Sequence, residues 1–179
     1  MWYKKEEGER FVTLKFTVDR IKIPFFNLIS LLYEVDLYHH WFPFCKQSFD
    51  YMKIRKTCKV TYQELVFPFP LKNRESIVCG YGVNRMSHNG TVLVMSKSLK
   101  QVDDPLIHQK VGVFSSDRRP EGLVENVIHF YGFEISPVSP TELSLRCCML
   151  VDPQISFIPD AMINYASKKF GDDMINKLL

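Results

Sequence analysis

The sequence predicts an α+β domain in which a curved antiparallel β-sheet wraps around one long C-terminal α-helix. Three observations lead to this fold class. Runs of alternating apolar and polar residues recur along the chain, as half-buried strands require. Two short helical patterns follow the first hairpin, and an apolar stripe with four-residue spacing ends the chain. A series of strands closed by a single long helix is typical of α+β domains, with the helix packed across the sheet.

The first part of the chain is expected to form a hairpin and two short helices. Phe11–Ile21 alternates between apolar and polar residues, which predicts a half-buried strand, and a turn pairs it with a short strand at Trp2–Lys4. Pro24 then opens a helix that extends to about Tyr33, with apolar residues at three- and four-residue spacing. A helical turn is expected around residues 36–41.

Strands dominate the middle of the chain. Two prolines interrupt them in the run Phe67-Pro68-Phe69-Pro70-Leu71. Because proline cannot donate to a sheet ladder, this run is expected to be an apolar loop. A long irregular segment is expected from Val102 to Gly122. The expected strands are Lys46–Ile54, Cys58–Val66, Glu75–Val83, Thr91–Leu99, Leu123–Ile135 and Glu142–Val151.

The last predicted element is an amphipathic helix from about Pro159. Proline suits the first helical position because its missing N–H would have no partner inside the helix. Gly171 weakens the helix by about 1 kcal/mol relative to alanine, so close packing or a bend is expected there. An ordinary core-facing helix is the simpler interpretation of the stripe, and a lid over a cavity is the other. The apolar face consists of Met162, Ala166, Phe170, Met174 and Leu178, widened by Ile163 and Ile175.

Length and composition indicate one cytoplasmic domain. A chain of 179 residues with 46% hydrophobic content can bury a core, and we interpret residues 1–179 as a single domain. The first ten residues, MWYKKEEGER, carry charges where a secretory signal needs an apolar run, and no run of eighteen apolar residues occurs. The five cysteines are an odd number, so reduced thiols are expected.

The charge pattern gives little support to nucleic-acid binding. The net charge is only +3, and most basic residues are dispersed. Two groups could attract an anionic membrane, although solvated surfaces explain them equally well. These groups are Lys53, Arg55, Lys56 and Lys59 in the second hairpin, and Lys168 and Lys169 in the last helix.

The chain resembles the START (steroidogenic acute regulatory protein-related lipid transfer) domain family, a branch of the helix-grip superfamily. Three landmarks carry the resemblance in the right order: WFPFCKQS after the helical turn, FPFPLKNRES at the apolar loop, and VDPQISFIPDAMINYASKKFG at the end. The resemblance covers nearly the whole chain. It implies a sheet that grips its C-terminal helix around an apolar tunnel, which holds one phospholipid, sterol or similar amphipath.

The resemblance also implies where such a ligand would lie. The loop with Phe67, Phe69 and Leu71 would gate the mouth of the tunnel, with the helix from Pro159 as its mobile partner, and Arg74 occupies the family's Asn-Arg-acidic motif. The expected lipid-binding residues further include Met149 in the last strand, and Met162, Ala166 and Phe170 on the helix. Transient contact with a membrane surface is expected during transfer.

A few polar groups normally orient a ligand in an apolar cavity. The candidates are Arg74, Glu125, His129, Tyr131 and Arg146. Each has a structural alternative: Arg74 could pair with Glu75 or cap a loop, His129 could be a core histidine, and Arg146 could lie on a solvated face.

Two departures from the family pattern are visible. Such domains start with a further helix and strand, whereas this chain is expected to start in the hairpin just before Val12 and to lack that front. Three alternatives explain the missing front. The sequence is a fragment, its start is wrongly assigned, or it is a divergent family member whose exposed sheet edge is covered by a protein partner. The phosphatidylcholine-specific branch has arginine six residues after the motif arginine, where this chain has Gly80, so phosphocholine recognition is not carried over.

No enzyme motif stands out, and we expect no catalytic residue, cofactor or metal. The sequence contains neither a nucleophile elbow nor a phosphate-binding loop, and Gly80-Tyr81-Gly82 lacks the third glycine of a dinucleotide motif. A cyclase- or hydrolase-like helix-grip enzyme, for example with His129 and Glu125, remains an alternative, as does a non-transferring interaction module.

Overall fold

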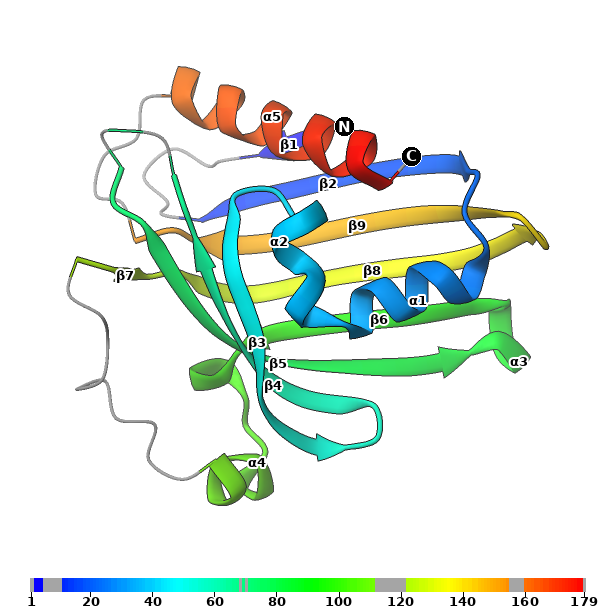
Figure 1. Ribbon diagram of the computed structural model, residues 1–179, viewed down its shortest axis with the longest axis horizontal. Helices are drawn as coiled ribbons and strands as arrows, with labels where there is room; N and C mark the ends of the chain where they lie inside the picture. Colours follow the sequence, from blue (N-terminus) through cyan, green and yellow to red (C-terminus); the bar gives the residue numbers. More distant parts are fainter. Residues whose placement is uncertain are drawn as a thin grey trace.

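The computed structural model describes residues 2–4, 11–67, 69, 71–111, 122–154 and 160–178, without the side chains of 2–4, 160, 162, 163 and 167. One curved sheet holds helices on its concave side (Figure 1). Its strands follow the order β1-β2-β9-β8-β6-β5-β4-β3, and β7 adds a parallel pair to β5. The strands are β1 (Trp2–Lys4), β2 (Val12–Ile21), β3 (Cys45–Arg55), β4 (Cys58–Leu65), β5 (Arg74–Arg85), β6 (Thr91–Ser98), β7 (Val124–Glu125), β8 (Val127–Ser139) and β9 (Glu142–Asp152).

The predicted α+β class is confirmed. All neighbouring strands in the main path pair antiparallel, and the sheet stays open between β1 and β3. The helices are α1 (Phe25–Tyr33), α2 (Tyr38–Trp41), α3 (Met86–Asn89), α4 (Pro105–Val111) and α5 (Asp160–Leu178), with 3₁₀ turns at Val35–Leu37 and Leu99–Gln101. No helix in these ranges is long and apolar enough to span a membrane.

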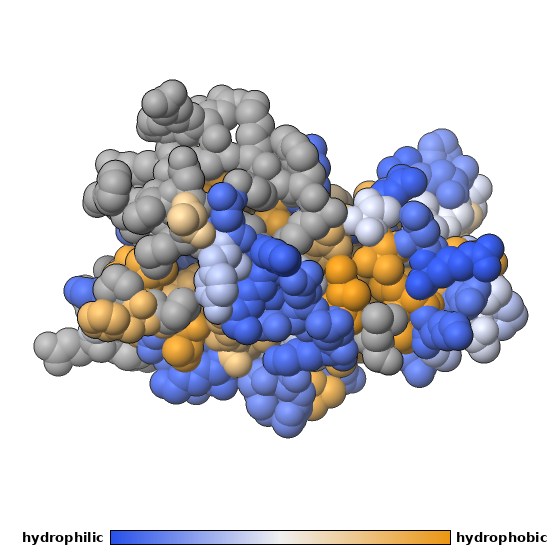
Figure 2. Space-filling view, turned by 90° about the horizontal axis from the view of Figure 1, so that it is seen from above, coloured by the Kyte–Doolittle hydropathy of each residue, from blue (hydrophilic) through white to orange (hydrophobic). Residues whose placement is uncertain are grey.

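Helix α5 closes one part of the concave face, as its apolar stripe predicts. Phe170, Met174 and Leu178 are buried in the main core, and the Phe170 ring lies edge-on to Phe42 with 5.5 Å between centroids. Gly171 is also buried, which fits the expected close packing. The side chain of Met162 lies outside the described residues. Hydrophilic residues cover much of the face seen from above, beside a patch of apolar residues (Figure 2).

Helix α1 covers a different part of the concave face. Leu28 and Leu32 are buried, as the predicted spacing requires. The last turn is held by Lys59 of β4, whose Nζ donates to the carbonyl of Tyr33 and forms a 2.7 Å ion pair with Asp50. A cation at a helix C-terminus is favoured by the exposed carbonyls there. Lys59 is therefore buried and paired, which corrects its assignment to a solvated basic turn.

From the sequence we expected an irregular segment from Val102 to Gly122. This prediction is wrong for Pro105–Val111, which form α4. Asp104 caps this helix through a 2.9 Å hydrogen bond from the Leu106 N–H to its carboxylate. Ile107 and Val111, four residues apart, pack into a second core cluster with Leu99. The Asp-Pro start is a helix signal, but seven residues give too few turns for a clear apolar period.

Candidate functional site

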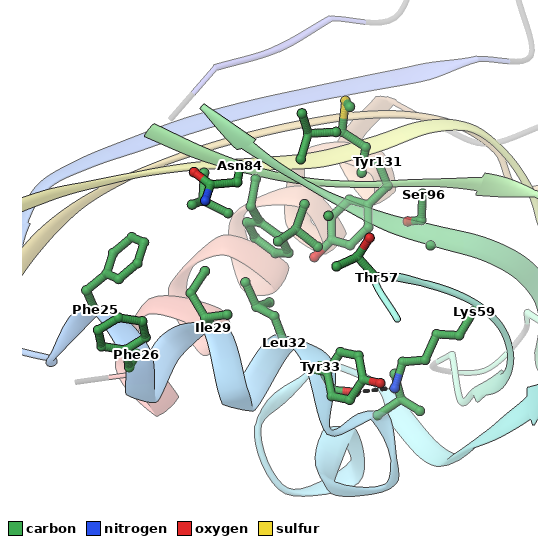
Figure 3. Close-up of a pocket in the computed structure, with 18 of the residues that line it drawn as sticks. Phe25, Phe26, Ile29, Leu32, Tyr33, Thr57, Lys59, Asn84, Ser96 and Tyr131 are labelled. Carbon is green, nitrogen blue, oxygen red and sulfur yellow. Dashed lines mark hydrogen bonds between the residues drawn. The ribbon is translucent and has the colours of Figure 1, made fainter. Parts of the chain in front are cut away.

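A cavity of about 1110 Å³ lies between α1 and the concave faces of β4, β5, β6 and β8. Side chains of α1 face those of the strands across this space (Figure 3). This volume slightly exceeds the usual range for small-molecule sites, which is about 300–1,000 Å³. The wall is largely apolar: its residues include Phe25, Phe26, Ile29, Leu32, Val78, Val94, Met95, Phe133, Pro137 and Val138.

Two glycines of β5 widen this cavity. A Cβ built on Gly80 would come no closer than 3.8 Å to any neighbouring atom, here Ser96 Cβ, and one on Gly82 would lie 4.0 Å from Thr57 Cβ. Both positions line the cavity, so the space that a side chain would take is left open. The Gly80-Tyr81-Gly82 run, which resembled part of a nucleotide motif, thus serves to enlarge a hollow.

A second hollow of about 170 Å³ lies beneath α5 and the 67–71 loop. Six of the predicted lipid-binding residues line it: Phe67, Leu71, Tyr131, Met149, Ala166 and Phe170. Phe44 shapes its wall from an unusual backbone conformation, with φ of 61°, and its ring lies 5.6 Å from that of Phe67. Left-handed backbone at a non-glycine residue is costly and persists where surrounding packing fixes it.

Four residues line both hollows and so mark the place where they adjoin: Gln63 of β4, Val78 of β5, Ser96 of β6 and Tyr131 of β8. Ser96 and Tyr131 are direct partners across the β6–β8 ladder. Tyr131 is only 9% exposed, and its hydroxyl has no hydrogen-bond partner. Burial raises the pKa of Tyr131 well above the usual tyrosine value, so the phenol stays neutral.

Arg74 lies outside both hollows, although the family motif made it the first polar candidate. Its guanidinium donates to the carbonyls of Lys72 and Asn73 at the base of the loop. The same group donates to the Pro153 carbonyl at 2.8 Å, and it lies 5.9 Å from the Phe67 ring centroid. Arg74 is only 3% exposed, and this burial lowers the pKa of its guanidinium. Arg74 therefore connects Phe67 and residues 72–73 to Pro153, which follows β9.

Three other polar candidates also lie away from the hollows. His129 sits at a β-bulge, where the β8–β9 register shifts between Ile128 and Phe130, and its ring packs edge-on against Phe11 at 4.8 Å. Arg146 is exposed and pairs with Glu134 at 3.3 Å. Glu125 pairs with Lys100 at 2.6 Å. Their assignment as ligand groups stays a prediction that the geometry does not favour.

Phe69 differs from the rest of the loop because its side chain is 95% exposed. It lines neither hollow and thus projects outward from the loop that covers the smaller one. Tyr165 of α5, which lines that hollow, is 62% exposed. The mouth of the smaller hollow therefore presents apolar and aromatic surface to its surroundings.

Sequence reasoning missed the wall provided by α1 and the polar pair Gln63 and Ser96. The alternation in β4 and β6 places each of them on a defined face, but it does not say which face is concave. The glycines of β5 were the available signal, because glycine in a strand interior often marks close approach or open space. No group of His, Cys, Asp and Glu residues suited to a metal was found within the described ranges.

No family model matches the sequence, and no curated protein matches it. Solved structures do share the fold. Human STARD10 has 20% identity and a TM-score of 0.71 over 99% of this chain and 67% of its own. The human StarD13 lipid transfer and protein localization domain has 14% identity and a TM-score of 0.73, and the match covers 99% of this chain and 82% of that domain. The more distant Zhui aromatase/cyclase from Streptomyces has 9% identity and a TM-score of 0.58, and the match covers 94% of this chain and 91% of the cyclase.

These similarities extend over nearly the full described chain and include the sheet and its C-terminal helix. They agree with the three sequence landmarks that suggested the resemblance. At these identities the likeness concerns the fold, and the chain has the helix-grip fold of START domains.

Proposed function

We propose that this chain is a non-enzymatic, cytoplasmic lipid-binding protein that holds one amphipath in the large cavity and transfers it between membranes. The observation that carries the proposal is the cavity of about 1110 Å³, with its largely apolar wall. The likeness of the fold to the StarD13 domain, which is named for lipid transfer, supports it. The ligand would enter and leave between the 67–71 loop and α5. The protein would contact membranes only transiently.

The energetics of apolar burial fit a carrier. Each buried methylene gains about 0.8 kcal/mol, so a sixteen-carbon chain gains roughly 12 kcal/mol, close to what it gains in a bilayer. Exchange between cavity and membrane is then nearly balanced. A carrier needs this balance, because a much tighter site would retain its cargo.

Extraction of the purified protein with organic solvent tests the proposal directly. We expect mass spectrometry to identify about one lipid per chain, and vesicle assays to detect transfer of that lipid class. Repeated recovery of empty protein, together with no transfer between vesicles, would contradict the proposal.

Replacing Phe69 with aspartate is expected to slow vesicle-to-vesicle transfer. The exposed phenyl ring would enter the lipid interface when the loop meets a membrane, and losing that burial lowers the rate by about tenfold. Stability should change little, because the side chain is 95% exposed. A fluorescence transfer assay and thermal unfolding measure the two effects.

Leu106→Asp is the matched control, since Leu106 is an apolar residue of α4 that is 54% exposed and lines neither hollow. Its transfer rate should stay at the wild-type value. Equal rates for the two variants would remove the membrane role of Phe69, and a marked loss of stability in Phe69→Asp would indicate a packing role instead.

A further inference from the structure

The place where the two hollows adjoin combines apolar walls with a buried, unused hydrogen-bonding group. Tyr131 is 9% exposed and lines both spaces, and its hydroxyl has no partner. Buried polar groups in proteins nearly always have partners, and an unpaired one costs about 1–3 kcal/mol. Because Tyr131 also lines both hollows, a molecule bound there can supply the missing partner of its hydroxyl.

The other polar groups at this place are uncharged. Gln63 is 8% exposed and carries an amide that can both donate and accept, and Ser96 carries a hydroxyl. Gln63, Ser96 and Tyr131 come from three different strands, so the sheet fixes their spacing. Together they offer donors and acceptors to a small polar group while the surrounding wall accommodates apolar surface.

Few charged groups line the large cavity, and one of them already has partners within the protein. Within the described chain, Lys56 and Lys59 are the charged residues among those that line it. Lys59 is neutralised by Asp50 at 2.7 Å, and its Nζ also donates to the Tyr33 carbonyl. Lys56 is exposed in the turn between β3 and β4. A phosphate at the junction of the hollows would thus have no available cation beside it, and a buried unpaired charge is costly.

We propose that the junction of the two hollows binds the hydroxyl group of an uncharged lipid, with Tyr131 as the donor to its oxygen. The ligand hydroxyl can accept from the Tyr131 phenol and donate to the Gln63 amide oxygen, which a carbonyl alone could not do. The apolar body of the lipid occupies the large cavity. Sterols and diacylglycerols both carry such a group. This inference rests on the proposed function, because it names the ligand class of the same cavity.

Tyr131→Phe tests the inference, because this change removes one oxygen and keeps the ring. The probes are cholesterol, 1,2-dioleoylglycerol and dioleoylphosphatidylcholine, each measured with the full chain by competition against a fluorescent lipid. We expect the wild type to prefer one or both hydroxyl lipids over the phosphatidylcholine. In Tyr131→Phe the affinity for the preferred lipid should fall about tenfold. The melting temperature of the empty protein should rise, because an unsatisfied buried hydroxyl is lost.

Tyr62→Phe is the matched control. Tyr62 is 8% exposed, its hydroxyl also lacks a partner, and it lines neither hollow. This variant should gain stability in the same way while its lipid affinities stay unchanged. The comparison of cholesterol with the diacylglycerol separates the two sources of the hydroxyl.

Three results would overturn the inference. Phosphatidylcholine could bind as tightly as the hydroxyl lipids, Tyr131→Phe could leave every affinity unchanged, or its empty form could lose stability, which would mean that the hydroxyl has a structural partner. Failure of all three lipids to bind the wild type would instead refute the proposed function, and this inference with it.

Discussion

Gly80→Leu is expected to weaken lipid binding by at least about tenfold while the protein stays folded. The new side chain would extend into the large cavity, because Gly80 lines it and its Cβ position has only ordinary contacts, the nearest at 3.8 Å. Crowding of a bound molecule costs about 1–3 kcal/mol, so affinity should fall by roughly tenfold or more. Stability should be equal or slightly higher, because glycine in a strand interior costs about 0.5–1 kcal/mol relative to alanine.

Tyr81→Leu provides the control on the same strand. Tyr81 is 37% exposed and lines neither hollow, since neighbouring residues of a strand point to opposite faces. Lipid extraction, competition binding and chemical unfolding should separate the two variants. Wild-type lipid content in Gly80→Leu would mean that the ligand lies elsewhere, and this result would count against the large cavity as the binding site.

The sheet and its closing helix could be predicted because their patterns are long. In β9 the alternation of Leu143, Leu145 and Cys147 matches their burial, since one face of the strand is covered throughout. In α5 the burial of Phe170 and Met174 follows the four-residue spacing in the same way. Such regular repeats identify an element and its buried face without knowledge of the neighbours.

The orientation of individual polar residues could be predicted less well. Strict alternation groups His129 with Tyr131, but the bulge between Ile128 and Phe130 breaks the period. Ile128 therefore joins Tyr131 in the core, and His129 is displaced from it. A bulge adds one residue to one strand only, so its position depends on the partner strand and is not visible in the sequence of β8 alone.

The junction of the two hollows lay equally beyond sequence reasoning. Gln63, Ser96 and Tyr131 belong to strands that are separated in the sequence by helices, turns and an apolar loop. Their common surface exists only once β4, β5, β6 and β8 are ordered in the sheet. Tyr131 was among the predicted ligand groups, whereas its two polar neighbours were not, because glutamine and serine in strands are far more often solvated than buried.

Arg74→Met is expected to lower the free energy of unfolding by about 3 kcal/mol, which corresponds to roughly 6–12 °C in melting temperature for a chain of this size. Methionine keeps the length of the side chain but leaves the carbonyls of Lys72 and Pro153 without their charged donor. Pro153 lies 79 residues from Arg74 in the sequence, so the hydrogen bond between them connects the end of the 67–71 loop to the residue that follows β9. Its loss should also increase amide hydrogen exchange at Leu71 and Gln154, which flank these contacts.

Arg146→Met gives the matched control, because Arg146 was an equally plausible ligand residue and pairs with Glu134 on an exposed surface. Exposed ion pairs contribute about 0–1 kcal/mol, so this variant should unfold near the wild-type temperature. Arg74→Lys should fall between wild type and Arg74→Met, because one ammonium cannot replace a planar guanidinium that reaches both the loop and Pro153. If Arg74→Met were as stable as Arg146→Met and instead lost affinity for anionic lipids, Arg74 would be a ligand residue, and the tie between the loop and α5 would have to lie in their apolar contacts.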